Sequence, residues 1–161
     1  MHHNVAVHIS ARVDYGVRAL LELARVWQEN PEKLTNGEEL ARLQAIPGKF
    51  LEAILRQLRQ GGLVSSQRGA VGGYRLGRNP ADISIADVVR ALDGPLAMIK
   101  HQRPEEVDYP GAASNLQHVW VALRAAMRDV LEHTSLLDVL SGDLSPVAHN
   151  YAKNPDSWMR H

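Results

Sequence analysis

Apolar residues recur every three or four positions through most of this chain, which is the spacing that places them on one face of an α-helix. In the first such segment Val13, Val17, Leu20 and Ala24 follow this period. The same spacing predicts helices over residues 10–28, 36–43, 47–60, 84–93 and 114–132, and a short last helix that begins near Ser135. We therefore expect a mainly α-helical fold.

Polar residues indicate where these helices begin. A Ser or Thr followed three residues later by Glu, Gln or Asp can satisfy the unpaired N–H groups of a first helical turn. This arrangement occurs at Thr35, Ser84 and Ser114. Pro47 suits a first helical position because its φ is preset and it has no N–H to lose. Residues 142–161 have few apolar positions, so we expect a poorly ordered tail there.

Residues 63–68 and 74–78 alternate between apolar and polar on either side of a glycine-rich tip, which predicts a β-hairpin. Two helices, a three-residue turn, a third helix and a hairpin follow one another in the order of a winged helix-turn-helix. The predicted fold is mainly α with a small β-hairpin. It comprises a winged helix-turn-helix domain over residues 10–96, an effector or linker loop over 97–113, and dimerisation helices over 114–141.

The composition is that of a folded domain. The 161 residues are 45% hydrophobic and carry a formal net charge of +0, which argues against disorder. The chain has no cysteine, which excludes disulfides, thiolate nucleophiles and Cys-ligated iron–sulfur clusters. No stretch approaches the ~20 apolar residues of a membrane span, and the N-terminus does not resemble a signal peptide. We expect a cytoplasmic protein without a membrane partner.

The zero net charge conceals an asymmetry. Residues 49–78 hold six basic residues and one acidic residue, whereas residues 79–161 hold seven basic and eleven acidic residues. A charge cluster is often no more than a solvated face. This one coincides with the third helix and the hairpin, the elements that a winged helix-turn-helix presents to DNA.

The third helix is the candidate recognition helix, because a helix fits the major groove and its N-terminus directs free N–H groups outward. Lys49, Arg56 and Arg59 are placed to reach phosphates. Glu52 either accepts from a cytosine amino group or caps the positive end of the helix. The full set of candidate residues for binding double-stranded DNA is Pro47, Lys49, Phe50, Glu52, Arg56, Arg59, Ser66, Arg68, Gly72, Gly73 and Tyr74. The spacing also assigns Phe50 to the apolar face of the helix.

The hairpin is the candidate wing. Gly72 and Gly73 permit positive φ and close backbone approach, and Arg68 stands at the tip, where an arginine can enter a narrow minor groove. A glycine-rich loop also occurs in nucleotide-binding enzymes. Here no Lys-Ser/Thr pair follows the glycines, and they lead into a strand rather than a helix, which disfavours that function.

The helix over residues 114–132 carries a stripe that needs a partner, since the winged domain already has a core. The stripe consists of Leu116, Val119, Trp120, Leu123, Met127, Val130 and Leu131. We expect it to form a homodimer, because two recognition helices one helical turn apart would match a pseudopalindromic operator.

Several segments resemble the Rrf2 family of bacterial transcription regulators. Residues 13–24 are similar to its opening helix, and residues 46–58, with Phe50-Leu51-Glu52, to its recognition helix. The most specific match is the wing, residues 68–76, and further matches lie at 83–89, 92–96, 119–131 and 134–136. The resemblance covers residues 12–140. It implies a DNA-binding homodimer whose long helix crosses to the other subunit, with DNA contacts at Lys49, Phe50, Glu52, Arg68, Gly72 and Gly73.

One departure from the family pattern concerns its cofactor. Members that bind an iron–sulfur cluster place three cysteines before the long helix and add a non-thiolate ligand, whereas residues 100–114 hold no cysteine. We expect no cofactor. Asp14, His101 and His118 are weak candidates for another metal. A small-molecule effector or a regulatory protein partner is then the expected signal, near Tyr109, Pro110 and Gly111 and beside Trp120.

The sequence thus predicts a sequence-specific, homodimeric transcriptional regulator, with repression as the expected mode, and without an iron–sulfur cluster. The alternative is a winged-helix module that binds another protein and no DNA. An enzyme ranks last, because no nucleophile–base pair is recognisable and the eight histidines follow no ligand spacing.

Overall fold

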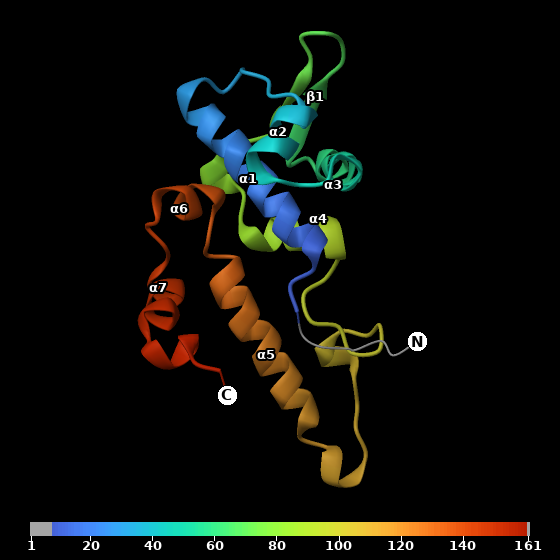
Figure 1. Cartoon of the computed structure of the whole chain (residues 1–161). Helices are drawn as coiled ribbons and strands as arrows, with labels where there is room; N and C mark the ends of the chain where they lie inside the picture. The colour runs from blue at the N-terminus through green and yellow to red at the C-terminus, as the bar shows by residue number, and fades with distance from the viewer. Residues whose placement is uncertain (1–7, 161) are drawn as a thin grey trace.

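The computed structural model describes residues 8–160, so the N-terminal residues 1–7 and His161 lie outside it. The elements are α1 (Ala11–Glu29), α2 (Gly37–Gln44), α3 (Gly48–Gln60), β1 (Val64–Gln67), β2 (Gly73–Leu76), α4 (Ile85–Asp93), α5 (Leu116–Leu131), α6 (Leu136–Ser141) and α7 (Pro146–Lys153), with short 3-10 turns between some of them. Figure 1 shows α1–α4, the hairpin and α6 as one body from which α5 extends. The predicted fold class, mainly α with a small hairpin, is confirmed.

Helix α1 is the centre of the core. It packs against α2, α3, α4, α6 and β2, and its buried side chains include Leu20, Leu23 and Ala24. Gly16 is also buried: a Cβ built there would lie 2.5 Å from Leu92 Cδ1 of α4 and 3.4 Å from Ile54 Cγ2 of α3. The missing side chain therefore lets α1 lie close to both α4 and the candidate recognition helix.

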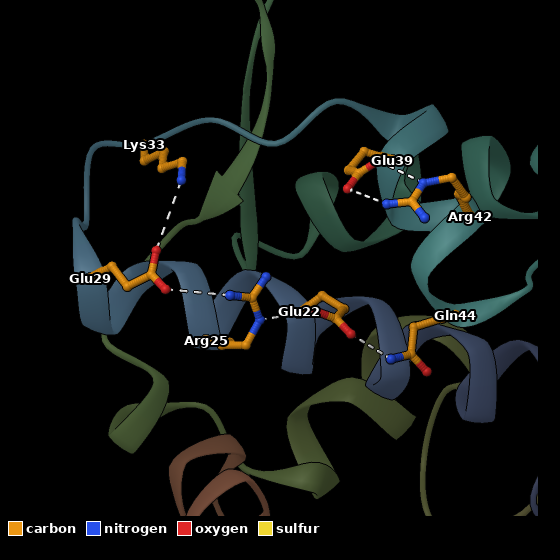
Figure 2. A network of polar contacts seen from close by, with 7 residues as sticks. All are labelled: Glu22, Arg25, Glu29, Lys33, Glu39, Arg42 and Gln44. Atoms are coloured by element: carbon orange, nitrogen blue, oxygen red, sulfur yellow. Dashed lines mark hydrogen bonds and ion pairs between the residues drawn. The ribbon is translucent and has the colours of Figure 1, made fainter.

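Polar contacts fix the turn between α2 and α3 on the surface of α1. Gln44 at the end of α2 donates from Nε2 to Glu22 Oε1 at 2.6 Å, and Gln44 accepts from the Arg18 guanidinium. Figure 2 shows Glu22 as the start of a chain of ion pairs along α1, through Arg25 to Glu29. The turn itself needs a left-handed residue, Ala45 at φ 51, followed by buried Ile46. These contacts set where α3 begins.

The helix starts follow the predicted capping residues in part. Ser84 and Ser135 form capping boxes with Asp87 and Asp138. The box predicted at Thr35 is wrong: Asn36 is the cap and accepts from Glu39 N. Thr35 instead pairs with the wing, since its N–H donates to Tyr74 O at 2.9 Å. Thr35, which the local pattern assigned to the start of the helix, thus forms a tertiary backbone pair with the hairpin instead.

Three further boundaries differ from the sequence prediction. Pro47 is the residue before α3 and not its first residue. No side-chain cap forms at Ser114, because a 3-10 turn over Gly111–Ala113 precedes it and the helix begins after Asn115. Residues 142–160 include α7 and a 3-10 turn, because Ser145 caps a helix that Pro146 opens. The predicted irregular tail is therefore corrected to a short helix followed by a turn.

No helix among residues 8–160 combines the length and the apolar character needed to traverse a lipid bilayer.

The hairpin is attached to the α1–α2 loop at the start of β2, next to the tip. Its strands pair antiparallel, with Val64 opposite Leu76 and Ser66 opposite Tyr74. Gly73 has φ 156, and a Cβ there would lie 2.6 Å from Thr35 O and 3.0 Å from Asn36 N. Only glycine lets β2 approach the α1–α2 loop this closely.

We expect Gly73→Ala to lower the free energy of unfolding by about 2 kcal/mol, because the added methyl group meets backbone atoms in a conformation that alanine rarely adopts. Gly48→Ala is the matched control, since a Cβ at that position has open space around it. Urea unfolding followed by circular dichroism measures both. Equal midpoints for the two variants would contradict this account of the wing.

Candidate nucleic-acid interface

A groove of about 460 Å³ separates α3 from the hairpin. Eight of the predicted DNA-binding residues line it together: Glu52, Arg56, Arg59, Ser66, Arg68, Gly72, Gly73 and Tyr74. The other three, Pro47, Lys49 and Phe50, lie exposed at the start of α3. Asn36, Gln67 and Gly69 also line the groove and were not predicted. For Asn36, the helix-cap pattern around this residue was the signal available in the sequence.

The periodicity of α3 explains which side chains face outward. Leu51, Ile54, Leu55 and Leu58 are buried against α1 and the other helices, so the residues between them are exposed. Phe50 does not belong to the buried set, because 62% of it is exposed. Its assignment to the apolar face is therefore wrong, and an exposed aromatic ring remains in the first turn of α3. Such a ring can contact a thymine methyl group.

A hydrogen bond joins the recognition helix to the wing. Arg59 Nη1 donates to Ser66 Oγ at 3.1 Å, so the helix and β1 are held as one surface. On the same face Arg56 Nη2 lies 3.6 Å from Glu52 Oε1, with both side chains more than half exposed. An exposed pair of this kind contributes little to stability. Arg56 can therefore leave Glu52 for a phosphate at small cost.

Not every basic residue of the segment 49–78 belongs to this face. Arg75 pairs with Glu32 and donates to Ser65 Oγ, and Arg78 lies 3.5 Å from Asp87. Arg68 and Lys49 have no ion pair with any residue in the range 8–160. The positive charge of the face accordingly comes from Lys49, Arg56, Arg59 and Arg68.

The apolar stripe of α5 does not face in one direction. Trp120, Leu123, Met127 and Leu131 line a cavity shared with the start of α1, the end of α4 and the loop that follows it. Val130 lines a groove with α7, and 55% of Val119 is exposed. Leu116 is half-buried. No residue of α5 is buried, and the role of these residues in a dimer stays a prediction.

The three weak metal candidates belong to different elements and do not contact a common partner. Asp14 pairs with Arg18 at 3.1 Å on α1, His101 is exposed in the loop, and His118 is exposed in the first turn of α5. Across residues 8–160 no three His, Cys, Asp or Glu side chains are grouped so as to hold a metal ion.

Comparison with known proteins identifies the family. The model of the Rrf2 family, described as iron-dependent transcriptional regulators, matches residues 9–142. The chain belongs to the Rrf2 family. It is 45% identical over 138 residues to Rv1287 of Mycobacterium tuberculosis, a candidate HTH-type transcriptional regulator, covering 86% of this chain and 84% of that one. To the HTH-type regulator CymR of Bacillus subtilis it is 35% identical over 133 residues, covering 83% and 89% of the two chains.

Solved structures agree with this assignment. The structure of B. subtilis CymR, named as the global cysteine regulator of that organism, has a TM-score of 0.69 at 32% identity, covering 84% of this chain and 98% of that one. A transcriptional regulator from Listeria innocua has a TM-score of 0.70 at 30% identity and covers 96% of both chains. The family and these relatives are transcriptional regulators and not enzymes, so this Rrf2 protein is a DNA-binding regulator.

The residues of this Rrf2 protein do not fit the iron of the family description. A protein-bound iron–sulfur cluster is held chiefly by cysteine thiolates, and the chain has no cysteine. The loop between α4 and α5 offers a largely apolar cavity instead of thiolates.

We expect Arg68→Ala to weaken binding to any duplex and to lower the salt slope, d log K/d log [salt], by about 0.9 in magnitude, because one phosphate contact is lost. Arg78→Ala is the control, since Arg78 pairs with Asp87 outside the groove. Fluorescence anisotropy of a labelled duplex at several salt concentrations measures both slopes. A lowered slope for Arg78→Ala and an unchanged one for Arg68→Ala would contradict the placement of the interface.

Proposed function

We propose that this Rrf2 protein is a homodimeric repressor that binds a pseudopalindromic operator sequence-specifically and works without an iron–sulfur cluster. The observation that carries the proposal is that the apolar side chains of α5 are not covered. A 16-residue helix extends from the winged domain with no buried residue, and its apolar side chains include exposed Val119. A helix with an apolar stripe is stable in water when another surface covers that stripe.

Pairing of two chains through α5 about a two-fold axis would explain how the protein recognises a pseudopalindromic operator. A dimer places two copies of α3 on one side of the assembly, and half-sites one helical turn apart, about 34 Å, then bind both copies. Each half-site meets Glu52, the one carboxylate between the arginines of the groove. A carboxylate near phosphates is unfavourable unless a cytosine amino group donates to it. This supports base recognition by Glu52 and phosphate binding by the arginines.

We expect Val119→Arg to raise the dissociation constant of the dimer at least about tenfold, because it places a charge in an apolar contact. Val71→Arg is the matched control: it is the same substitution at the wing tip, where Val71 is 84% exposed. Sedimentation velocity over a range of protein concentrations measures the monomer–dimer equilibrium. A wild-type protein that stays monomeric at micromolar concentration would overturn the homodimer.

We expect Glu52→Ala to reduce discrimination at one base pair of each half-site by about 1–3 kcal/mol, the value of one specific base contact. Arg56→Ala should instead weaken binding to the operator and to random duplexes alike. The measurement is competition binding against a series of operators with single base-pair changes. An equal loss on operator and random DNA for Glu52→Ala would exclude base recognition by this residue.

Transcription from a template that carries the bound operator tests the direction of regulation. Repression predicts fewer transcripts as wild-type protein is added, with Arg56→Ala shifting the effect to higher concentration. More transcripts would overturn repression. No DNA binding at low salt would favour the protein-interaction module instead.

A further inference from the structure

The residue that caps α2, Asn36, is held beside the wing. Two backbone hydrogen bonds join Thr35 to Tyr74: the Thr35 N–H donates to Tyr74 O at 2.9 Å, and the Tyr74 N–H donates to Thr35 O at 2.8 Å. A Cβ on Gly73 would lie 3.0 Å from Asn36 N, so the two chain segments are in close contact. Figure 1 shows the start of α2 next to the hairpin. The position of Asn36 is therefore tied to that of the wing.

Asn36 also lines the groove between α3 and the hairpin. Three arginines and one carboxylate, that of Glu52, line the same groove, so its surroundings are positively charged. The two acidic residues in the first turn of α2, Glu38 and Glu39, do not line it. Asn36 is thus an exposed, neutral side chain on the face that the arginines offer to DNA.

The cap hydrogen bond determines which end of the Asn36 side chain is free. Asn36 Oδ1 accepts from the Glu39 N–H at 2.8 Å. A backbone N–H can donate only to the oxygen of a side-chain amide, so the other end of the group is the Nδ2 donor. Within residues 8–160, Nδ2 donates to no other residue. Two N–H donors therefore remain on a side chain that lines the groove.

Capping alone does not explain why asparagine occupies this position. Asn, Asp and Ser cap helices about equally well, and the negative charge of Asp also suits the positive end of a helix. Asparagine is the neutral member of this group whose amide offers two N–H donors in addition to the oxygen used in the cap. A carboxylate at residue 36 would repel a polyanion in the groove, whereas the amide can donate to it.

The groove has a defined place on a bound duplex. A winged helix-turn-helix protein inserts its recognition helix, here α3, in the major groove, and Arg68 at the wing tip is placed for the adjacent minor groove. One sugar–phosphate strand separates the two grooves of DNA, so this strand passes over the space between α3 and the hairpin. Asparagine is among the side chains that donate to phosphate oxygens in protein–DNA complexes.

We propose that Asn36 donates from Nδ2 to a phosphate of the strand that separates the major groove from the minor groove. This proposal rests on the DNA binding of the proposed function. Because Asn36 is bonded to α2 and held against the wing, the contact ties both elements to one point on the DNA backbone. A phosphate contact fixes the orientation of a protein on the duplex and carries no sequence information of its own.

The first test is Asn36→Ser, which keeps a capping oxygen, adds no charge and removes the two amide donors. We expect the dissociation constant to rise about threefold to tenfold for the operator and for random duplexes alike, the effect of losing one hydrogen bond. The salt slope should stay at the wild-type value, because a neutral donor releases no counterion. Fluorescence anisotropy of a labelled duplex at several salt concentrations measures both quantities.

Two further variants separate the phosphate contact from the cap. Asn36→Asp keeps the cap and brings a carboxylate to the phosphate, so it should weaken binding more than Asn36→Ser does. Asn154→Ser is the matched control, because Asn154 is an exposed cap whose Oδ1 accepts from the Asp156 N–H at 3.1 Å, after α7 and away from the hairpin (Figure 1). It should leave DNA affinity unchanged. Urea unfolding verifies that each variant is folded.

The second test locates the phosphate. Methylphosphonate linkages, which replace one charged phosphate oxygen by a methyl group, are placed one at a time through an operator selected in vitro with the wild-type protein. We expect one linkage in each half-site at which the replacement weakens wild-type binding at least about threefold and leaves the binding of Asn36→Ser unchanged. A double-mutant cycle of this kind isolates a direct contact from a general change in the protein.

The outcomes distinguish this contact from the function on which it rests. If Asn36→Ser binds as tightly as wild type, or if both proteins lose the same affinity at every linkage, the contact is wrong and the proposed function stands. If Asn36→Asp binds better than Asn36→Ser, residue 36 acts only as a cap, and the contact is again wrong. If the wild-type protein binds no duplex at low salt, both the proposed function and the contact are overturned.

Discussion

The close packing of α1 against α3 and α4 is the constraint on which the rest of this structure depends. Gly16 is the point of contact: its missing side chain leaves room for Leu92 of α4 and Ile54 of α3. Because α3 is held on α1, its buried and exposed faces are fixed, and so is the direction of every side chain offered to DNA. The same helix holds the α2–α3 turn through Glu22 and Arg18. The interface therefore depends on residues far from its surface.

Local rules in the sequence predicted most of this arrangement. The 3.6-residue period found α1, α3 and α5. The cap predicted at Ser84 was confirmed, and Ser135, where the last short helix was expected to begin, caps α6, because an Asp stands three residues after each Ser. The cap predicted at Thr35 was wrong because the Thr35 backbone pairs with Tyr74, 39 positions later in the chain. No local pattern encodes such a pairing. The prediction for Phe50 was wrong because the helical period shows where the apolar face lies but does not show whether a neighbouring element covers the edge of that face.

Most residues of the candidate site could be predicted from the sequence, but the ion pairs among the charged residues could not. The charge cluster over residues 49–78 includes the three arginines that line the groove between α3 and the hairpin, Arg56, Arg59 and Arg68. It could not show that Arg75 and Arg78 are directed to Glu32 and Asp87, because those acids come from other elements. Likewise the stripe of α5 was visible as a period, while its division between a cavity and an exposed edge depends on the loop folding beside Trp120.

The space beside α5 is connected to the candidate DNA-binding face through the helices of the core. Val13 and Val89 in its wall belong to α1 and α4, the two helices that meet at Gly16 and support α3. Protein interiors are close-packed, so a change in how α1 and α4 meet displaces what rests on them. A second surface that covers α5 and favours one arrangement of α1 and α4 over another would shift the population of α3 positions by that difference in affinity.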